Sequence, residues 1–351
     1  MWLAEVKDII RLEKPKHSLA EAVQSDLSAS PRVVVLMSTY QGALYVREQL
    51  LSVLMQLPAQ GTIVVRDDGS CDATVAEIAK IADPRIKVIL GQNLGFGQSF
   101  LTLLTLVPED VDMVMFADQD DVWLSNKIAR AWEGVRSVGD VPALYGSAQT
   151  LVDQHLKSLH VTTTPSRGPS LANALTENII VGCTAAINRP AFMLLRRAGV
   201  PTGVQFHDWW LYLVVSAFGT VVYDDRPTLL YRQHGANVIG RRVGWLGHLQ
   251  GAYKVVTRND WLGVLLGQVH AFVEHYGDSL PPDIGAWIAQ HFERQGGETV
   301  PRWTLVFSTQ RWRQSLADDL ALRILLLLHK CGWAAGKRQA TGGVSASGRM
   351  G

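Results

Sequence analysis

The first half of the chain alternates between two hydrophobic periods. Unbroken apolar runs of strand length predict strands that are covered on both faces. These runs lie at residues 33–37, 62–65, 86–89 and 113–116. Between them, apolar residues recur at helical spacing, at 45–57, 72–81, 100–106 and 127–135. This pattern predicts an α/β fold in which a parallel sheet lies between two layers of helices, an α/β/α arrangement.

The alternation loosens after about residue 140. Shorter apolar runs predict further strands at 143–145, 185–187, 220–223 and 228–230. Beyond residue 240 the spacing is mostly helical, at 245–276, 282–294 and 316–331. We therefore expect four parts: a helical extension (1–30), an α/β domain (31–240), a helical region (241–336) and a disordered Gly/Ser-rich tail (337–351).

Composition narrows the class of protein. A chain of 351 residues with 47% hydrophobic residues has material for one or two domains with a large core. Its net charge of +1 gives no basic field for nucleic acid, so we expect no nucleic-acid partner. The three cysteines lack metal-ligand spacing, and no apolar run has the length of a transmembrane helix. The N-terminus lacks the pattern of a signal peptide, so we expect a cytoplasmic protein.

Three carboxylates, Asp118, Asp120 and Asp121, follow directly after the apolar run 113–116. Like charges this close repel one another, and burying them without a partner is unfavourable. A hard divalent cation such as Mg²⁺ or Mn²⁺ would neutralise them, since it prefers oxygen ligands. The alternative is a solvated acidic turn.

Polar residues also follow the first two predicted strands. Thr39 and Tyr40 come after the first strand, and Asp67 and Asp68 end the second. Ligands bind at this carboxyl edge in open α/β sheets. A carboxylate there can accept the imide N–H of uracil or thymine, although a turn capped by the same carboxylate is an alternative.

Two small-residue motifs give weaker signals. Asn93 and Gly95 follow the third strand, where glycine lets the backbone approach a phosphate or a ribose; a plain tight turn is the alternative. Gly182 and Cys183 precede a later strand without the features of a nucleophilic cysteine. We interpret them as a small-residue wall of the pocket.

Asp208 lies between His207 and the pair Trp209 and Trp210. A carboxylate beside indole rings in a partly dry cleft has a raised pKa, which suits a general base, and the indoles offer faces to a sugar. The alternative is a buried helix that starts at the tryptophans and is capped by Asp208.

Arg232 and His234 lie in a polar segment after the strand at 228–230. A guanidinium can hold a pyrophosphate through two parallel hydrogen bonds, and histidine can ligate a metal. A structural histidine is the alternative. The glycines at 235 and 240 suggest a loop that closes over the bound ligand.

The spaced set of these motifs over residues 31–240 resembles glycosyltransferase family 2, which has the Rossmann-like GT-A fold. The matching strings are Ser38–Tyr40, Asp67–Ser70, Asn93–Gly95 and a D-x-D at Asp118–Asp120. The strings around Asp118–Trp123, Asn178–Asn188, His207–Trp210 and Tyr231–Gly235 resemble the rhamnosyltransferase branch.

This resemblance implies a nucleotide-sugar donor, most simply a dTDP-sugar carrying L-rhamnose, and inversion at the anomeric carbon with Mn²⁺ or Mg²⁺. The acceptor would be a saccharide or a lipid-linked saccharide of a bacterial surface polysaccharide. Asp208 would be the general base, although family members commonly have Glu-Asp where this chain has His207-Asp208.

The resemblance also distributes the remaining roles. Asp120 and His234 would hold the metal. The donor side would comprise Thr39, Tyr40, Asp67, Asp68, Asn93, Gly95, Asp118, Gln119 and Arg232. The acceptor side would comprise Gly182, Cys183, Trp209 and Trp210.

Two other functions are weighed against this one. A nucleotidyltransferase would show a Gly-rich basic loop after the first strand, but the first basic residue there is Arg47. A non-catalytic sugar-binding protein would be suggested by loss of Asp120 or Asp208, and both are present.

The C-terminal region combines aromatic, apolar and basic residues, a composition typical of a helix at a membrane interface. It predicts peripheral contact with the inner membrane. The alternatives are an amphipathic helix packed on the catalytic domain and a homodimer formed through these helices.

Overall fold

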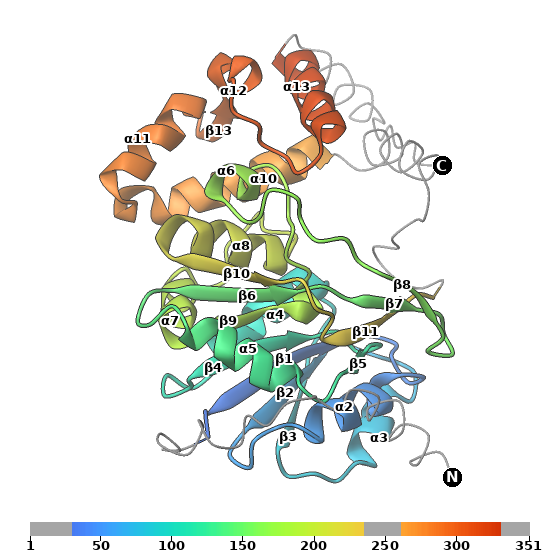
Figure 1. Ribbon diagram of the computed structural model, residues 1–351. Helices are drawn as coiled ribbons and strands as arrows, with labels where there is room; N and C mark the ends of the chain where they lie inside the picture. The colour runs from blue at the N-terminus through green and yellow to red at the C-terminus, as the bar shows by residue number, and fades with distance from the viewer. Residues whose placement is uncertain (1–29, 235–260, 331–351) are drawn as a thin grey trace, which may run out of the picture.

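The computed structural model describes residues 30–234 and 261–330 (Figure 1). The predicted extension up to residue 29, the segment 235–260 and the predicted tail lie outside the described residues.

A central sheet of seven strands has the order β10-β6-β9-β4-β1-β2-β3. Its strands are β1 (Val33–Thr39), β2 (Thr62–Asp67), β3 (Ile86–Leu90), β4 (Met113–Ala117), β6 (Ala143–Ser147), β9 (Ala186–Asn188) and β10 (Thr220–Asp224). All run parallel except β9, which is antiparallel to both β4 and β6. The strands predicted in the first half of the chain, β1 to β4, are parallel as expected, whereas the later strand β9 runs in the opposite direction. A strand buried on both faces has the same apolar pattern in either direction, so the sequence did not reveal the reversal.

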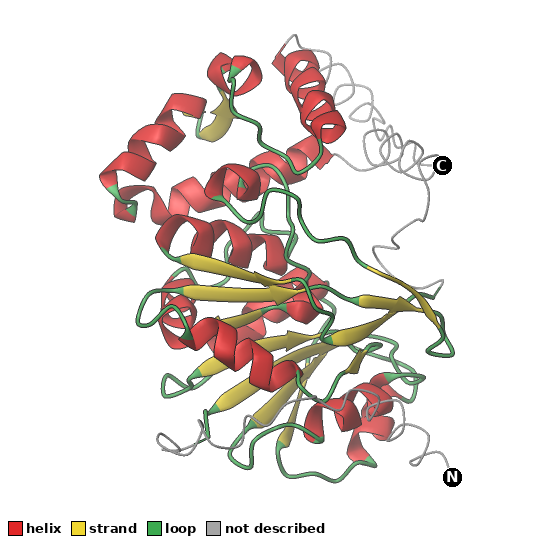
Figure 2. Ribbon diagram, in the orientation of Figure 1, coloured by secondary structure: helices red, strands yellow, loops and turns green. Residues whose placement is uncertain are grey.

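Helices cover both faces of this sheet (Figure 2). One face packs against α2 (Val46–Leu54), α3 (Thr74–Ala79) and α5 (Lys127–Arg136). The other packs against α4 (Phe96–Thr105), α7 (Arg189–Arg197) and α8 (His207–Phe218). Successive residues of β1 supply the two cores, Val33 and Val35 on one face and Val34 and Leu36 on the other. This confirms the three-layer α/β/α fold.

A second sheet, of order β5-β11-β7-β8, adjoins the carboxyl edge of β4. It consists of β5 (Val122–Trp123), β7 (Thr150–Val152), β8 (Ser158–Val161) and β11 (Leu229–Arg232). β5 follows directly after the carboxylates of 118–121 and pairs with β11. This pairing brings Arg232 next to the carboxylates, although about 110 residues separate them in the sequence.

Two short elements line the approach to α8: α6 (Leu171–Ala174) and the 3₁₀ turn η1 (Gly182–Thr184). The η1 turn lies against β4 and leads into β9.

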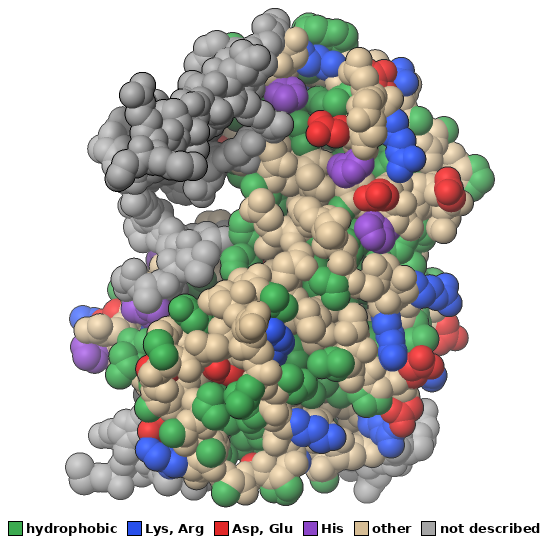
Figure 3. Space-filling model, turned by 180° about the vertical axis from the view of Figure 1, so that it is seen from behind, with side chains coloured by type: hydrophobic (Ala, Val, Ile, Leu, Met, Phe, Trp, Pro, Cys, Tyr) green, Lys and Arg blue, Asp and Glu red, His purple; other side chains and the backbone are tan. Residues whose placement is uncertain are grey.

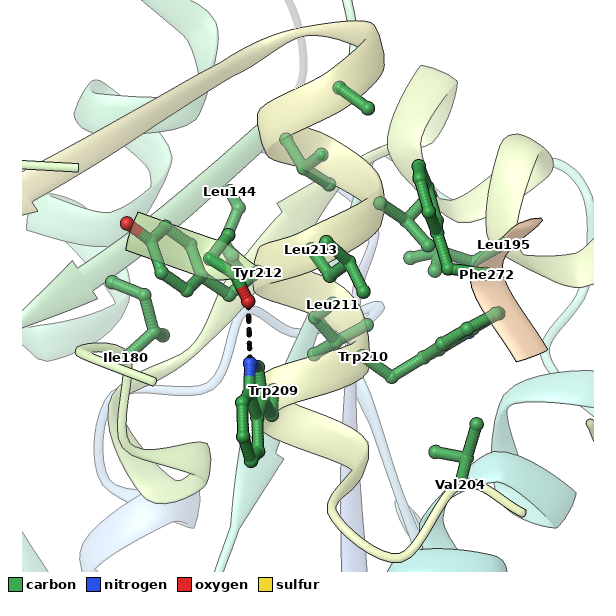
Figure 4. Packing of buried hydrophobic residues seen from close by; sticks show 14 of the residues in the cluster. Leu144, Ile180, Leu195, Val204, Trp209, Trp210, Leu211, Tyr212, Leu213 and Phe272 are labelled. Atoms are coloured by element: carbon green, nitrogen blue, oxygen red, sulfur yellow. Dashed lines mark hydrogen bonds between the residues drawn. The ribbon is translucent and has the colours of Figure 1, made fainter. Parts of the chain in front are cut away.

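The C-terminal region packs on the outer side of α8. It contains α10 (Trp261–Tyr276), η2 (Gly277–Ser279), α11 (Pro282–His291), β12 (Phe292–Gln295), β13 (Glu298–Pro301), α12 (Trp303–Phe307) and α13 (Leu316–Lys330). Trp210 of α8 extends toward Phe272 of α10 (Figure 4) and lies 5.9 Å from Tyr276, measured between ring centroids. Because α8 lies between the sheet and α10, it is apolar nearly all round.

The predicted helix 282–294 was too long, because it ends at His291. Residues 292–301 form a hairpin instead, and its turn residues Gly296 and Gly297 have φ of 59° and 85°. Two consecutive positive φ angles suit a tight hairpin turn, and glycine adopts them without strain. Among the described residues, no helix is both long and apolar enough to cross a membrane.

Candidate active site

The carboxylates after β4 gather where the two sheets meet. Ligand atoms of Asp118, Asp121 and Cys183 lie within 4.8 Å of one another. Burial, followed by the neighbouring charge of Asp120, raises the pKa of Asp118 to about 7. The same two causes raise the pKa of Asp121 well above its usual range. The site therefore holds more negative charge than its surroundings stabilise.

The donor set fits a hard divalent cation. The buried Oδ2 of Asp121 has no hydrogen-bond partner within residues 30–234 and 261–330. Asp118 and Asp120 are partly exposed, so a cation that also holds a phosphate would reach them from solvent. Burial raises the pKa of the Cys183 thiol, and a protonated thiol is a poor ligand for Mg²⁺ or Mn²⁺. We therefore favour the carboxylates over Cys183 as ligands.

The two predicted metal ligands lie next to each other. His234 Nε2 is 2.8 Å from Asp120 Oδ2, and the imidazole stacks on Tyr45 with ring centroids 5.1 Å apart. This pairing fixes the orientation of the imidazole beside the carboxylate cluster. Tyr45 was not among the predicted site residues.

Lys127 is a site neighbour that the sequence reasoning missed. Its side chain is fully buried, its Nζ lies 3.3 Å from Thr228 Oγ1, and it stands 4.8 Å from the centre of the Trp123 ring. Burial lowers its pKa to about 8, which the charge of Asp121 partly opposes. It occupies the apolar face of α5, and that helical spacing was the signal that would have identified a buried lysine.

Asp208 lies in the first turn of α8, with its carboxylate held by two backbone groups. Gly182 N donates to Oδ2 at 3.1 Å, and Trp209 N donates to Oδ1 at 2.8 Å. Burial raises the pKa of Asp208 to about 6, and its charge contributes to the raised pKa of Asp118. A carboxylate with this pKa, close to the cluster, can accept a proton near neutral pH.

His207, in contrast, is not suited to accept a proton near neutral pH. Its ring stacks on Phe100 with a centroid distance of 4.1 Å and also contacts Phe116. Burial lowers its pKa to about 3, so the imidazole is neutral. Its position among aromatic rings assigns it to packing and leaves Asp208 as the base candidate of this pair.

The tryptophans that follow Asp208 are core residues. Trp210 is 1% exposed and packs toward α10. Trp209 is also buried, and its Nε1 donates to the Ala174 carbonyl oxygen at 2.7 Å. The expectation that both indoles stack on an acceptor sugar was wrong, because α8 is covered on both sides and leaves them no exposed face.

Gly182 and Cys183 lie inside the wall beside Asp208. Both are buried, and Gly182 contributes its backbone N–H to Asp208 rather than a surface for the acceptor. A Cβ added at Gly182 would lie 2.7 Å from His207 Nε2 and 3.5 Å from Asp208 Cβ. Glycine is therefore required there by the close approach of α8. The prediction that Gly182 and Cys183 form a small-residue wall is consistent with this packing. Direct contact of the buried Cys183 with an acceptor is not consistent with it.

The predicted nucleotide side forms a continuous hydrogen-bonded edge. Asp67 Oδ2 accepts bonds from Thr39 Oγ1 at 2.9 Å and from Ser70 Oγ at 2.7 Å, and Asp67 Oδ1 accepts one from Ser70 N at 2.8 Å. Asp68 pairs with Arg66 and accepts a bond from Leu94 N. Both carboxylates are buried and fix the turns that follow β2.

More exposed residues surround these turns. Gln119 exchanges two hydrogen bonds with the Tyr40 backbone, at 2.9 and 3.0 Å, and so ties the loop after β1 to the D-x-D segment. Asn93 Oδ1 accepts a bond from Gly95 N at 2.9 Å, and Gly95 has a φ of 77°. The buried residue Gln49, which was not predicted, donates to the Asp118 carbonyl oxygen at 2.9 Å.

Arg232 is held by internal contacts beside the carboxylates. Its side chain donates to three acceptors, Asp120 O at 2.8 Å, Gln154 O at 2.7 Å and Glu48 Oε2 at 2.5 Å, and it is only 2% exposed. It also lies in β11, which pairs with β5 and β7. Strand pairing and an internal ion pair hold Arg232 in this structure, and its predicted contact with a bound pyrophosphate stays a prediction. The glycines of the predicted loop lie outside the described residues.

A surface hollow lies elsewhere. It has a volume of about 540 Å³ and is lined by residues such as Asp112, Arg136 and Arg189. These residues lie near the start of β4 and the end of β9. They are away from the edge of the sheet that carries Asp118, Asp120 and Asp121, which we call the carboxylate edge. The chemical groups at the carboxylate edge, rather than the hollow, identify the candidate site.

A three-layer α/β fold with carboxylates at the carboxyl edge of its strands is an architecture of nucleotide-binding enzymes. Residues 34–196 match the family model described as Glycosyl transferase family 2. The chain thus carries a glycosyltransferase domain of family 2, with the GT-A fold.

Curated relatives are glycosyltransferases. The dTDP-rhamnosyl transferase RfbG of Shigella flexneri is 28% identical over 246 residues, which cover 64% of this chain and 80% of that protein. The uncharacterized glycosyltransferase alr2836 of a Nostoc strain is 30% identical over 59% of this chain and 66% of that protein. A crystal structure of S. aureus TarS in complex with UDP-GlcNAc is 13% identical, with a TM-score of 0.49 over 72% of this chain and 77% of that one. That structural likeness is remote.

Proposed function

We propose that this glycosyltransferase moves L-rhamnose from dTDP-L-rhamnose to a hydroxyl of a saccharide or lipid-linked saccharide, with inversion. The similarity to a dTDP-rhamnosyl transferase supports the donor. The observation that carries the chemistry is the position of Asp208, a carboxylate with a pKa of about 6 beside the acidic cluster.

A sugar hydroxyl is a poor nucleophile near neutral pH, so a positioned base accelerates its attack. Asp208 is deprotonated above about pH 6, and its two backbone hydrogen bonds hold it in one orientation. His207 is neutral and enclosed by aromatic rings, so it does not compete for this proton.

Inversion by direct displacement needs no enzyme nucleophile. The nearest thiol, Cys183, is buried, and its raised pKa keeps it protonated. Among the described residues, the site thus offers a base and a protonated thiol, which favours a single displacement over a covalent intermediate formed on Cys183.

A divalent cation would be held by the carboxylates of Asp118, Asp120 and Asp121, with His234 beside them. When bound, such a cation neutralises the diphosphate leaving group. Lys127 remains behind the cluster as a buried cation and limits the net negative charge of the site.

On the nucleotide side, we propose that Thr39, Tyr40 and Asp67 line the base and the ribose. We propose that Asp68, Asn93, Gly95 and Gln119 shape the loops around them. Asp67 Oδ2 already accepts two hydrogen bonds, whereas Oδ1 accepts one from Ser70 N and has a second lone pair, so Oδ1 can still accept the imide N–H of thymine. On the acceptor side, we propose only the opening next to Asp208 and Gly182.

The test is to offer a panel of nucleotide sugars with Mn²⁺ or Mg²⁺ and saccharide acceptors. We expect dTDP release and an α-linked rhamnosyl product from dTDP-L-rhamnose, with the anomeric configuration read by NMR. Transfer from a uridine-linked sugar alone would overturn the donor assignment. Formation of a nucleotide sugar from a sugar phosphate would instead support the nucleotidyltransferase alternative.

A further inference from the structure

Tyr45 lies between the start of α2 and the segment that ends β11. Its side chain makes no hydrogen bond that caps α2. The ring instead contacts two side chains that come much later in the sequence. The guanidinium carbon of Arg232 lies 4.6 Å from the centre of the ring, and the His234 imidazole stacks on it with centroids 5.1 Å apart and planes inclined by 27°. The ring thus has a role outside its own helix.

Arg232 and His234 reach the ring together because they are two positions apart in an extended segment. Gln233 N donates to the Val152 carbonyl oxygen at 2.8 Å, which continues the pairing of β11 with β7 beyond Arg232. Alternate residues of an extended segment project to the same side. The local backbone therefore brings both side chains to Tyr45.

Arg232 gives the ring a fixed neighbour. Its guanidinium pairs with Glu48, which lies in the first turn of α2, and the two side chains are only 3% and 14% exposed. A cation that is removed from water is attracted to an aromatic face more strongly than an exposed one. The ion pair and the contact with Tyr45 therefore hold the start of α2 against the end of β11.

Two contacts orient the imidazole of His234. Its Nε2 lies 2.8 Å from Asp120 Oδ2, and this contact fixes the direction of one ring nitrogen. An imidazole can still turn about the axis through that nitrogen. The stacked ring of Tyr45 determines the plane of the imidazole, because stacked aromatic rings prefer to lie face to face with an offset.

We propose that Tyr45 is a positioning residue for the divalent cation, because its ring holds the His234 imidazole in the orientation that directs Nε2 at the Asp120 carboxylate. This inference rests on the proposed function, in which His234 contributes to the cation site, and it adds a residue of α2 to that site. Groups that orient a metal-ligating side chain commonly change the affinity for the metal when they are removed. An aromatic ring is sufficient for this role, so phenylalanine should replace tyrosine.

The test is calorimetric titration of the full chain with dTDP, in Mn²⁺ and in excess EDTA. Tyr45→Leu should weaken binding in Mn²⁺ roughly threefold or more, since the imidazole loses its stacked neighbour. Binding in EDTA should equal that of wild type, which also shows that the variant is folded. Tyr45→Phe keeps the ring and should bind like wild type under both conditions.

The matched control is Trp303→Leu, which removes a ring with the same two kinds of neighbour. Trp303 stacks on Phe307 with centroids 5.9 Å apart, and Lys330 Nζ lies 5.2 Å from the centre of its ring. Trp303 belongs to α12, at the opposite end of the molecule from α2 (Figure 1). Seen from behind, hydrophobic and basic side chains lie side by side at that end (Figure 3). This variant should bind dTDP like wild type with and without Mn²⁺.

A double-mutant cycle shows whether Tyr45 acts through His234. In the His234→Ala background, Tyr45→Leu should cause no further loss of binding in Mn²⁺. An equal loss in both backgrounds, or a loss in Tyr45→Phe as large as that in Tyr45→Leu, would overturn the positioning role. Wild type that binds dTDP equally with Mn²⁺ and with EDTA would contradict the proposed function itself. Cation-dependent binding that is the same in wild type and in Tyr45→Leu would overturn this inference alone.

Discussion

Asp208 shows how one residue acquires its chemistry from its surroundings. Its neighbours in the sequence are a histidine and two tryptophans, and all three are packed into the core. Its own carboxylate is left at the start of α8, held by backbone N–H groups of η1 and of Trp209. Burial then brings its pKa to about 6, the range in which a carboxylate serves as a base at neutral pH.

The Asp208→Asn variant should therefore fold and bind donor, but lose transfer by roughly 10²-fold or more, since it keeps the shape and removes the basicity. In wild type, the transfer rate should rise as the pH passes through about 6 and stay level above it, because only the deprotonated carboxylate accepts the proton. Single-turnover rates of both proteins, measured from about pH 4.5 to about pH 8, would check both expectations, because this range lies on both sides of the pKa. An unchanged rate in the variant, or a profile without a step near pH 6, would exclude Asp208 as the base.

The residue scale also shows what the sequence could and could not reveal. The carboxylates at 118–121 and Asp208 were recognisable because each follows an apolar run or starts one. The burial of Arg232, Trp209 and Trp210 was not recognisable from the sequence. A motif gives residue types and their order, whereas burial depends on which elements pack around a residue. Lys127 was missed because a lysine at a helix start ordinarily faces solvent.

At the scale of elements, α4 and the loop before α8 are in unusually close contact. A Cβ added at Gly97 of α4 would lie 2.1 Å from the Gln205 carbonyl oxygen, which belongs to the backbone and has little freedom to move. Gln98 donates to the Val204 carbonyl oxygen at 2.8 Å in the same contact. This contact sets the position at which α8, and with it Asp208, begins.

Gly97→Ala should consequently lower the free energy of unfolding by about 1–3 kcal/mol, as expected for an overpacked site. The matched control is Gly285→Ala in α11, where the nearest atom to the added Cβ is 3.9 Å away. There, the higher helix propensity of alanine should stabilise the protein by up to ~1 kcal/mol. Urea unfolding of the two variants gives the comparison, and equal effects at both glycines would contradict the close contact.

The order and number of the first elements followed from the sequence, because buried strands and amphipathic helices have distinct periods. The direction of β9 and the hairpin at 292–301 could not be predicted from the sequence. A run of three apolar residues carries no direction, and a Gly-Gly pair also suits a simple helix end.

On the scale of the whole molecule, the α/β layers and the C-terminal helices share one core. A single cluster of buried residues extends from β1 through α8 to α10 and α13, and includes Trp210, Phe272 and Leu326. Two parts that share a core in this way should unfold together rather than as separate domains. The boundary near residue 240 predicted from the sequence remains a prediction.

Phe272→Ala should therefore lower the free energy of unfolding of the whole molecule by about 3–5 kcal/mol, with one transition seen by both tryptophan fluorescence and far-ultraviolet circular dichroism. Phe307→Ala is the matched control, since Phe272 is 0% exposed and Phe307 is 68% exposed. That variant should stay within about 0.5 kcal/mol of wild type. Two separated transitions in the Phe272 variant would show that the C-terminal region is an independent unit.

The central claim is that the carboxylate edge binds a nucleoside diphosphate together with a divalent cation, and calorimetric titration with dTDP tests it most directly. We expect binding in the presence of Mn²⁺ that weakens roughly tenfold or more in excess EDTA and in Asp120→Asn, because the cation offsets the charge between the carboxylates and the diphosphate. Asp208→Asn should bind dTDP like wild type. Equal binding with Mn²⁺ and with EDTA, and equal binding by Asp120→Asn and wild type, would contradict the account.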